Sequence, residues 1–218
     1  MRASRSAPAS TDLRHALRDL AAAITGTPVR TIRVEYHYPA IIFSDGAYEE
    51  QRGDEAGTIG GVVLDPWTRQ YHWYAMAVSP LALAALRRSS ENPIVTIELV
   101  AIQVGLFLFS AILAERPIIG FVDNEPGRHA IIRGTSGPVE AASVVQEICD
   151  LEIAHKLLCY WARVPSPSNL ADDPSRGITP APLPGWPAPQ RALCSSFSSS
   201  FSTMTGRVKW GLRDLSTV

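Results

Sequence analysis

Four acidic residues in the middle of the chain stand at positions where chemistry is common in α/β proteins. Asp45 follows the apolar run IIFS and Asp123 follows IIGFV, so each is expected to end a short strand. Glu98 lies near the start of a long apolar segment, and Asp172 opens a short polar one. We expect both of these segments to be helices, and carboxylates at such junctions lie where open sheets place their ligands.

Four carboxylates cannot be packed together as bare charges, because repulsion and loss of water would protonate some of them or unfold the site. Divalent cations remove this cost. A set of oxygen ligands alone suits Mg²⁺ or Mn²⁺ rather than zinc. Two such ions about 3.5–4 Å apart stabilise the attacking and leaving oxygens of a phosphoryl transfer. The four acids therefore indicate metal-dependent chemistry on a phosphate ester.

The pattern of apolar and turn residues predicts the elements that must position these acids. A helix is expected at 11–24, followed by a β-prone segment at 29–38. The remaining expected elements, in chain order, are strands at 40–44, 58–64 and 69–78, helices at 80–88 and 94–114, a strand at 118–122, a helix opening near Pro126, a helix at 139–158, a strand at 159–164 and a short helix at 169–176.

This order predicts an α/β fold with a five-stranded mixed sheet. The first three strands are joined by short links and should be antiparallel, and the last two should be parallel to the first, with helices on both faces. If the first, fourth and fifth strands are parallel neighbours, all four acids meet at one edge of the sheet.

The apolar segment 94–114 is long enough to cross a membrane. Glu98 and Gln103 lie inside it, however, and a charge in a span is costly. We therefore expect a buried helix and no membrane partner. Glu98 would lie in its first turn, where the helix dipole favours a negative charge.

Composition limits the remaining possibilities. With 20 basic and 21 acidic residues the net charge is −1, which argues against strong autonomous binding to nucleic acid. The three cysteines show neither metal spacing nor a paired framework, and the N-terminus has no apolar core typical of a secretory signal. These features indicate an intracellular protein, cytoplasmic or nuclear. The expected domains are a helix and lead-in segment at 1–38, a catalytic domain at 39–176, and a Pro- and Ser-rich tail at 177–218 that is mostly extended or loosely attached.

Four segments, taken together, resemble the type 1 ribonuclease H domain of retroelement reverse transcriptases. They are IIFSDGAYE (41–49), TIELVAI (96–102), GFVDNEPGRHAIIRGTS (120–136) and WARVPSPSNLADDPSR (161–176). The resemblance implies a ribonuclease H-like fold and hydrolysis of the RNA strand of an RNA–DNA hybrid with two Mg²⁺ ions, for which Mn²⁺ may substitute. By position, Asp45 would bridge both ions, Glu98 and Asp123 would complete the site, and Asp172 would hold the second ion.

The same resemblance suggests residues that would contact the substrate: Gly46, Asn124, Arg128, Ser136 and Asn169. For all of them except Gly46, a structural role as a cap or loop residue is an alternative interpretation. The expected partners are the hybrid itself and a reverse transcriptase polymerase domain, in cis or in trans. That domain would supply affinity, since no basic, aromatic-rich substrate-binding segment is visible.

Two alternatives remain open. Many members of the family carry a histidine in the loop before the last acid, and here the loop 163–171 has none. This departure is compatible with a decayed, non-catalytic scaffold. A nuclease or integrase of the same fold that acts on another nucleic acid is the other alternative. Ala47 argues against a proofreading exonuclease, which needs an acid two residues after Asp45.

Overall fold

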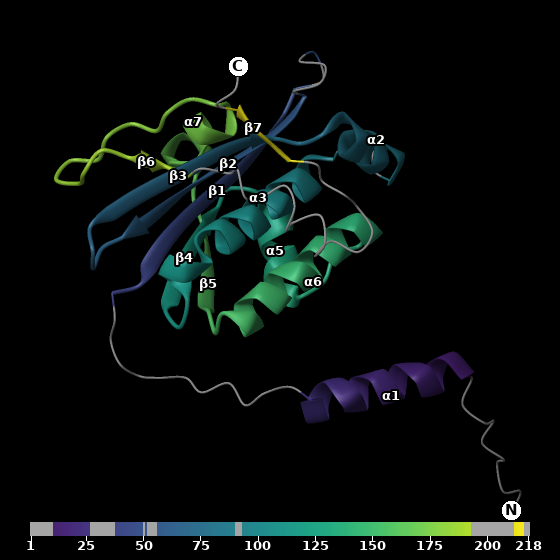
Figure 1. Ribbon diagram of the computed structural model, residues 1–218. Coiled ribbons are helices and arrows are strands. Elements are labelled where there is room, and N and C mark those ends of the chain that lie inside the picture. The colour runs from purple at the N-terminus through teal and green to yellow at the C-terminus, as the bar shows by residue number, and fades with distance from the viewer. Residues whose placement is uncertain are drawn as a thin grey trace, which may run out of the picture. The chain divides into compact units, whose positions relative to one another are not determined.

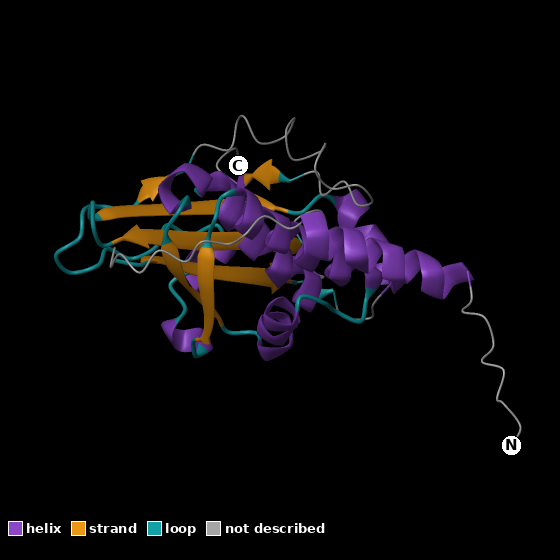
Figure 2. Ribbon diagram, turned by 90° about the horizontal axis from the view of Figure 1, so that it is seen from below, coloured by secondary structure: helices purple, strands orange, loops and turns teal. Residues whose placement is uncertain are grey.

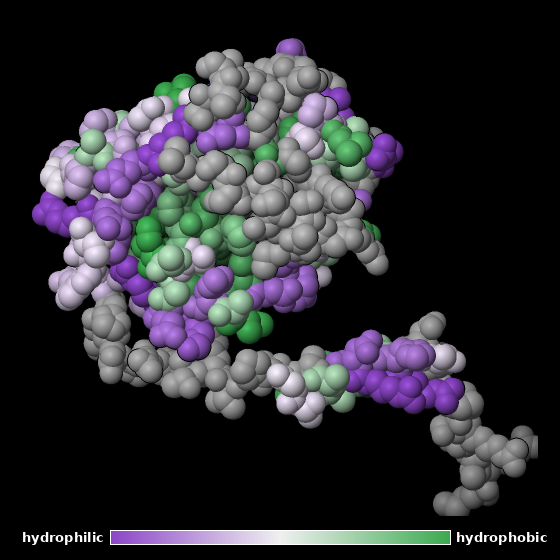
Figure 3. Space-filling view, viewed as in Figure 1, coloured by the Kyte–Doolittle hydropathy of each residue, from purple (hydrophilic) through white to green (hydrophobic). Residues whose placement is uncertain are grey.

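The computed structural model describes residues 11–26, 38–49, 51, 56–89, 93–192 and 212–215. The chain divides into two units, 1–35 and 36–218 (Figure 1). The described part of the first unit is one helix, α1 (Thr11–Gly26), as expected. Its visible side in Figure 3 is polar along most of its length. Its leucines are about half exposed. The β-prone segment 29–38 lies outside the described residues, apart from Tyr38.

The second unit is built on one layer of strands (Figures 1 and 2). The five main strands are β1 (Ala40–Tyr48), β2 (Gly57–Asp65), β3 (Gln70–Ala77), β4 (Pro117–Val122) and β5 (Leu158–Arg163). Their order in the sheet is β5-β4-β1-β2-β3. The β1–β2 and β2–β3 pairs are antiparallel, and the β1–β4 and β4–β5 pairs are parallel. The predicted order and directions are confirmed.

The predicted number of strands is wrong, because the segment after 176 adds two more. The short strands β6 (Gln190–Arg191) and β7 (Arg213–Asp214) both pair with β3, so the sheet has seven strands. The Tyr71 hydroxyl also donates a hydrogen bond to the Ala181 carbonyl (3.0 Å). Contrary to the expectation of a loosely attached tail, Ala181 and residues 190–192 are therefore tied to β3 by hydrogen bonds.

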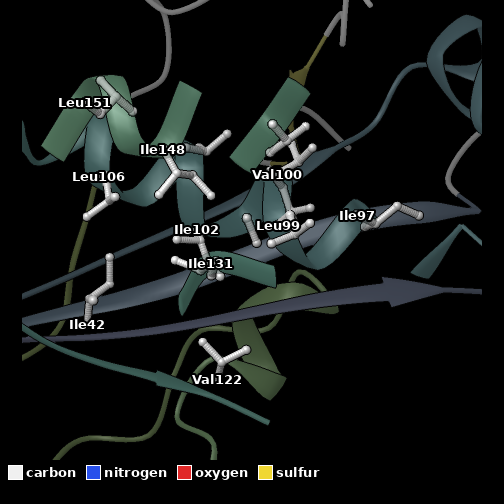
Figure 4. Close-up of a cluster of buried hydrophobic side chains, with 14 of the residues drawn as sticks. Ile42, Ile97, Leu99, Val100, Ile102, Leu106, Val122, Ile131, Ile148 and Leu151 are labelled. Carbon is white, nitrogen blue, oxygen red and sulfur yellow. The ribbon is translucent and has the colours of Figure 1, made fainter. Parts of the chain in front are cut away.

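The helices cover both faces of the sheet, as predicted. They are α2 (Pro80–Ser89), α3 (Ile94–Leu108), α4 (Ser110–Leu113), α5 (Glu125–Arg133), α6 (Val139–Ala154) and α7 (Asp172–Ser175). The main core lies between the sheet and α3, α5 and α6. Figure 4 shows Ile42 of β1 and Val122 of β4 with Ile102 of α3, Ile131 of α5 and Ile148 of α6. A smaller core on the opposite face contains Val62 and Trp73, with α7 and the tail beside it.

Helix α3 is the buried centre of the fold, and none of the described helices is long and apolar enough to cross a membrane. The predicted single helix at 94–114 is interrupted at Phe109, after which α4 begins. Glu98 is the fifth residue of α3 and not part of its first turn, so the predicted contribution of the helix dipole is wrong. Eleven consecutive residues, 96–106, are buried, which explains why the sequence of this helix is apolar on nearly all sides.

An ion pair anchors the end of the sheet opposite the acids. The Asp65 carboxylate accepts hydrogen bonds from the Trp67 amide (3.0 Å) and the Thr68 hydroxyl (2.7 Å), which close the β2–β3 turn. Arg116, ahead of β4, lies 2.8 Å from the same carboxylate. The guanidinium holds the pKa of Asp65 well below its usual range.

Candidate metal centre

Three of the four expected acids come together at one edge of the sheet. Asp45 is supplied by β1, Glu98 by α3, and Asp123 follows the last residue of β4. One carboxylate oxygen of each lies within 4.8 Å of the others. Asp45 and Glu98 are each only 7% exposed, and Asp123 is half-buried. The parallel β1–β4 pair brings the two aspartates to the same edge, as the sheet order predicts.

Asp45 does not end its strand, contrary to the prediction, because β1 continues to Tyr48. Asp45 pairs with Gly60 of β2, while the next residue, Gly46, packs against α3. A Cβ at Gly46 would lie 2.9 Å from the Glu98 amide nitrogen and 3.0 Å from Glu98 Cγ. The glycine therefore lets β1 and α3 approach closely enough for Glu98 to reach the aspartates.

Asn124 links Glu98 to the start of α5. Its Nδ2 donates a hydrogen bond to Glu98 Oε1 (3.0 Å), and its Oδ1 accepts one from the Gly127 amide (2.9 Å). The second bond is an N-cap, which explains why α5 begins directly after Asn124. The side chain thus fixes one oxygen of Glu98 toward Asn124 and leaves the other free of this bond.

Two oxygens of the cluster are buried without a hydrogen-bond partner among the residues that the structure describes. They are Glu98 Oε2 and Asp123 Oδ1. An unpaired buried acceptor of this kind is costly, so each such atom needs an explanation. A bound cation is a direct explanation, because a carboxylate oxygen without a donor is the ligand that a hard divalent ion prefers.

Burial also raises the pKa of both enclosed acids. The pKa of Asp45 is about 7, because loss of solvent outweighs the hydrogen bond from Ser175, and the charges of Asp123 and Asp172 act in the same direction as burial. The pKa of Glu98 is about 8, mainly through burial and partly through its two acidic neighbours. The positive charge around these two acids is too small to keep their pKa values in the usual range. The donor set therefore fits a hard divalent cation, which Asp45, Glu98 and Asp123 would hold.

Asp172 lies next to this group but outside it. It is the first residue of α7, and its Oδ1 is 2.9 Å from Nη2 of Arg176. Another residue of α7 contacts the cluster directly: the Ser175 hydroxyl donates to Asp45 Oδ2. Gly60 makes this possible, since a Cβ there would lie 2.2 Å from the Ser175 amide nitrogen.

Of the expected substrate-contacting residues, Gly46 and Asn124 contact Glu98, whereas the hydrogen bonds of Arg128 and Asn169 have structural roles. Arg128 pairs with Glu125 (2.9 Å). Asn169 is buried, donates to the Ser44 carbonyl (3.2 Å) and accepts from the Ala171 amide (3.1 Å), so it ties the entry of α7 to β1. Ser136 is half-buried just after α5.

The sequence interpretation missed Ser175 and Arg176, although both lie close to Asp172 in sequence. The only available signal was spacing, since residues three and four positions after Asp172 fall on its side of a helix. Such spacing is too common to single out either residue.

Comparisons with known proteins give structural similarity only. No family model and no curated protein sequence matches the chain. Among solved structures, it is similar to the N-terminal ribonuclease H domain of a Mycobacterium tuberculosis protein (14% identity, TM-score 0.48, covering 64% of this chain and 91% of that one). It is also similar to LC11 ribonuclease H1 isolated from compost (15% identity, TM-score 0.48, 65% and 98% covered).

A third similar structure is the protease–reverse transcriptase of prototype foamy virus, with 11% identity and a TM-score of 0.40. The match covers 67% of this chain and 20% of the viral protein. Identities and scores this low say nothing about activity. The ribonuclease H-like α/β fold is identified by the strand order, the strand directions and the helices on both faces of the chain itself.

Proposed function

We propose that the chain is a metal-dependent endonuclease that hydrolyses the RNA strand of RNA–DNA hybrids. The observation that carries this proposal is the group of Asp45, Glu98 and Asp123, with two buried oxygens lacking any partner among the described residues. The group lies at the edge of a ribonuclease H-like sheet, and its three members are acids that the sequence resemblance assigns to a metal site. A phosphodiesterase activity at this edge agrees with the oxygen-only donor set.

The residues of the chain have distinct parts in this proposal. Asp45, Glu98 and Asp123 bind the cations, with Asp172 as the further ligand of a second ion. When bound, Mg²⁺ lowers the pKa of a water molecule and stabilises charge on the phosphate oxygens. Asn124 and Ser175 orient the Glu98 and Asp45 carboxylates through the bonds described above.

Substrate contacts form the next part of the proposal. Arg128 and Ser136, on and after α5, would contact backbone phosphates, and Gly46 and Asn124 border the carboxylates. Because the net charge is −1, these contacts give weak binding on their own. A reverse transcriptase polymerase domain, in cis or in trans, is the proposed partner that raises affinity. A retroelement origin and an intracellular location, cytoplasmic or nuclear, belong to the same proposal.

The decayed-scaffold alternative is disfavoured by the cluster itself. A scaffold that no longer binds metal has no use for two nearly buried acids whose pKa values are raised to about 7 and about 8. Neutral residues in place of Asp45 or Glu98 would stabilise the fold, so the presence of these two acids supports a working site. The other alternative, a nuclease of the same fold that acts on another nucleic acid, is tested by the set of substrates described below.

Cleavage of strand-labelled substrates by the full chain tests the proposal. The substrates are an RNA–DNA hybrid, duplex RNA, duplex DNA and single-stranded RNA, each with Mg²⁺, Mn²⁺ or chelator. Asp45→Asn and Asp123→Asn should abolish cleavage of the hybrid RNA. Asp150→Asn, which removes an exposed acid of α6, is the matched control and should cleave like the unaltered chain. Cleavage that survives in chelator, or in Asp45→Asn, would refute the proposal.

A further inference from the structure

The fourth acid, Asp172, forms an ion pair with Arg176, the residue that follows α7. Asp172 Oδ1 and Arg176 Nη2 are 2.9 Å apart. Asp172 is nevertheless close enough for its charge to act on Asp45. In the described part of the chain, the group of mutually close carboxylates stops at Asp45, Glu98 and Asp123. Asp172 therefore lies beside the metal centre without taking part in it.

Ser175 anchors the helix that carries Asp172, whereas the two side chains of the ion pair are exposed. Ser175 is fully buried and bonded to Asp45, and its backbone packs directly on Gly60. By contrast, the Asp172 and Arg176 side chains are 44% and 48% exposed. A change of partner would therefore involve two exposed side chains beside a helix that is anchored by Ser175.

Arg176 already has a second acid within reach. Its Nη1 lies 4.0 Å from Glu49 Oε1, next to the end of β1. The guanidinium is thus shared between two exposed carboxylates, and ion pairs with this degree of exposure are weak. A phosphate group competes well against them, because it accepts two parallel N–H bonds from one guanidinium.

We propose that Arg176 is a positioning residue that holds Asp172 outside the metal centre in the free chain and releases it when a nucleic-acid phosphate takes its place. The exchange rests on the proposed function, since it needs a nucleic-acid strand at this edge. Three carboxylates then bind cations in the free chain, and the fourth joins them only when the strand is bound. Substrate binding and completion of the metal centre become one event.

The first test is calorimetric binding of Mn²⁺ to the full chain without nucleic acid. Arg176→Ala frees Asp172 and should bind Mn²⁺ about fivefold more tightly or better, because a further carboxylate becomes available. The double variant Asp172→Asn/Arg176→Ala removes a neutral pair and should stay within about twofold of the unaltered chain. Arg176→Lys, which keeps the charge, should fall between the unaltered chain and Arg176→Ala.

Two results would overturn the role of Arg176. One is an Arg176→Ala variant that binds Mn²⁺ like the unaltered chain. The other is a double variant that binds Mn²⁺ several-fold more weakly, since Asp172 would then already be a ligand in the free chain. Lys156→Gln is the matched control: it removes an exposed cation that pairs with Glu115 (2.6 Å) at the opposite end of β4, and it should change nothing.

The second test measures binding of the RNA–DNA hybrid in chelator by fluorescence anisotropy over a series of salt concentrations. Arg176→Ala should weaken binding and lower the slope of log K against log salt by about 1, whereas Lys156→Gln should change neither. Equal slopes for the unaltered chain and Arg176→Ala would overturn the exchange. If the unaltered chain neither binds nor cleaves hybrid, the proposed function fails and the exchange with it. The Mn²⁺ measurements then still decide whether Arg176 withholds Asp172.

Discussion

The buried acids should make the fold less stable at alkaline pH when no divalent cation is present, and Glu98→Gln is the variant that tests this. Glutamine keeps an oxygen for the Asn124 bond and replaces the unpaired carboxylate oxygen by an NH₂ group. That group can donate to the neighbouring Asp123. The substitution therefore removes the charge with little change in shape.

The size of the effect follows from the pKa of Glu98, which burial raises from 4.5 to about 8. The folded chain keeps a proton that the unfolded chain releases, so this contribution to stability is fully present below pH 4.5 and is lost as the pH rises through 8. A difference of about 3.5 pH units corresponds to on the order of 5 kcal/mol. This is an upper limit, because Asp45 titrates in the same cluster.

Urea unfolding in chelator, followed by tryptophan fluorescence, measures this effect. Between about pH 5 and pH 8, Glu98 alone should account for about 3 kcal/mol of the unfolding free energy that the unaltered chain loses, so Glu98→Gln should lose clearly less. Some pH dependence should remain, because the pKa values of Asp45 and Glu147 are also raised, to about 7. At pH 8 the variant should be the more stable protein, although it should have no cleavage activity.

Millimolar Mg²⁺ supplies a second arm of the same experiment. It should restore stability to the unaltered chain at alkaline pH and have little effect on Glu98→Gln, because a cation stabilises only the state that binds it. A stability profile in chelator that is flat between about pH 5 and pH 9 would refute the reasoning, as would a variant that is less stable at pH 8.

Three further predictions concern two residues that support the site and one that supports only the smaller core. Gly60→Ala should cost about 2 kcal/mol in urea unfolding and reduce cleavage more than Mg²⁺ binding to the cluster, because its Cβ would meet Ser175 and displace α7. Asn124→Ala should cost about 1 kcal/mol by loss of the α5 cap, and should weaken Mn²⁺ binding in calorimetry by freeing Glu98. Trp186→Ala should cost about 1–2 kcal/mol without changing cleavage at a temperature where the variant is folded, because Trp186 packs on the smaller core.

Most of the sheet could be predicted because its strands alternate or cluster apolar residues between clear turn signals. The Asp65-Pro66 turn, for instance, marks the β2–β3 hairpin, and it forms as expected. The length of β1 could not be read in this way. Gly46 and Ala47 weaken the strand pattern, and only the pairing of β1 with β2 carries it on to Tyr48.

The break in the long helix and the attachment of the tail have similar explanations. Phe109 interrupts the helix without any glycine or proline to signal it. In the tail, proline content favours a loose segment, but the apolar Leu183 and Trp186 between the prolines pack on the sheet. Average composition hides single apolar residues of this kind, whereas the packing of the tail depends on them.

The candidate site was also predicted in part only. Asp45 and Asp123 meet because β1 and β4 are parallel neighbours, as the predicted topology requires, and Glu98 joins them because α3 packs against β1 at Gly46. Asp172 depends on side-chain choice instead, because the same carboxylate could face the cluster or Arg176. Spacing of four residues permits that ion pair, and only the structure decides which partner is taken.

The two short strands beside β3 also determine where the chain can be shortened without exposing the edge of the sheet. The resemblance ends at Arg176, which makes that residue an obvious end point for a shortened protein. Such a protein would present the backbone amides and carbonyls of β3 to solvent, next to Trp73, which the Arg191 guanidinium otherwise covers at 4.6 Å. A bare strand with apolar neighbours is a template for pairing with other chains. Insolubility of a 39–176 fragment would then report the loss of this cover and not a failure of the core to fold.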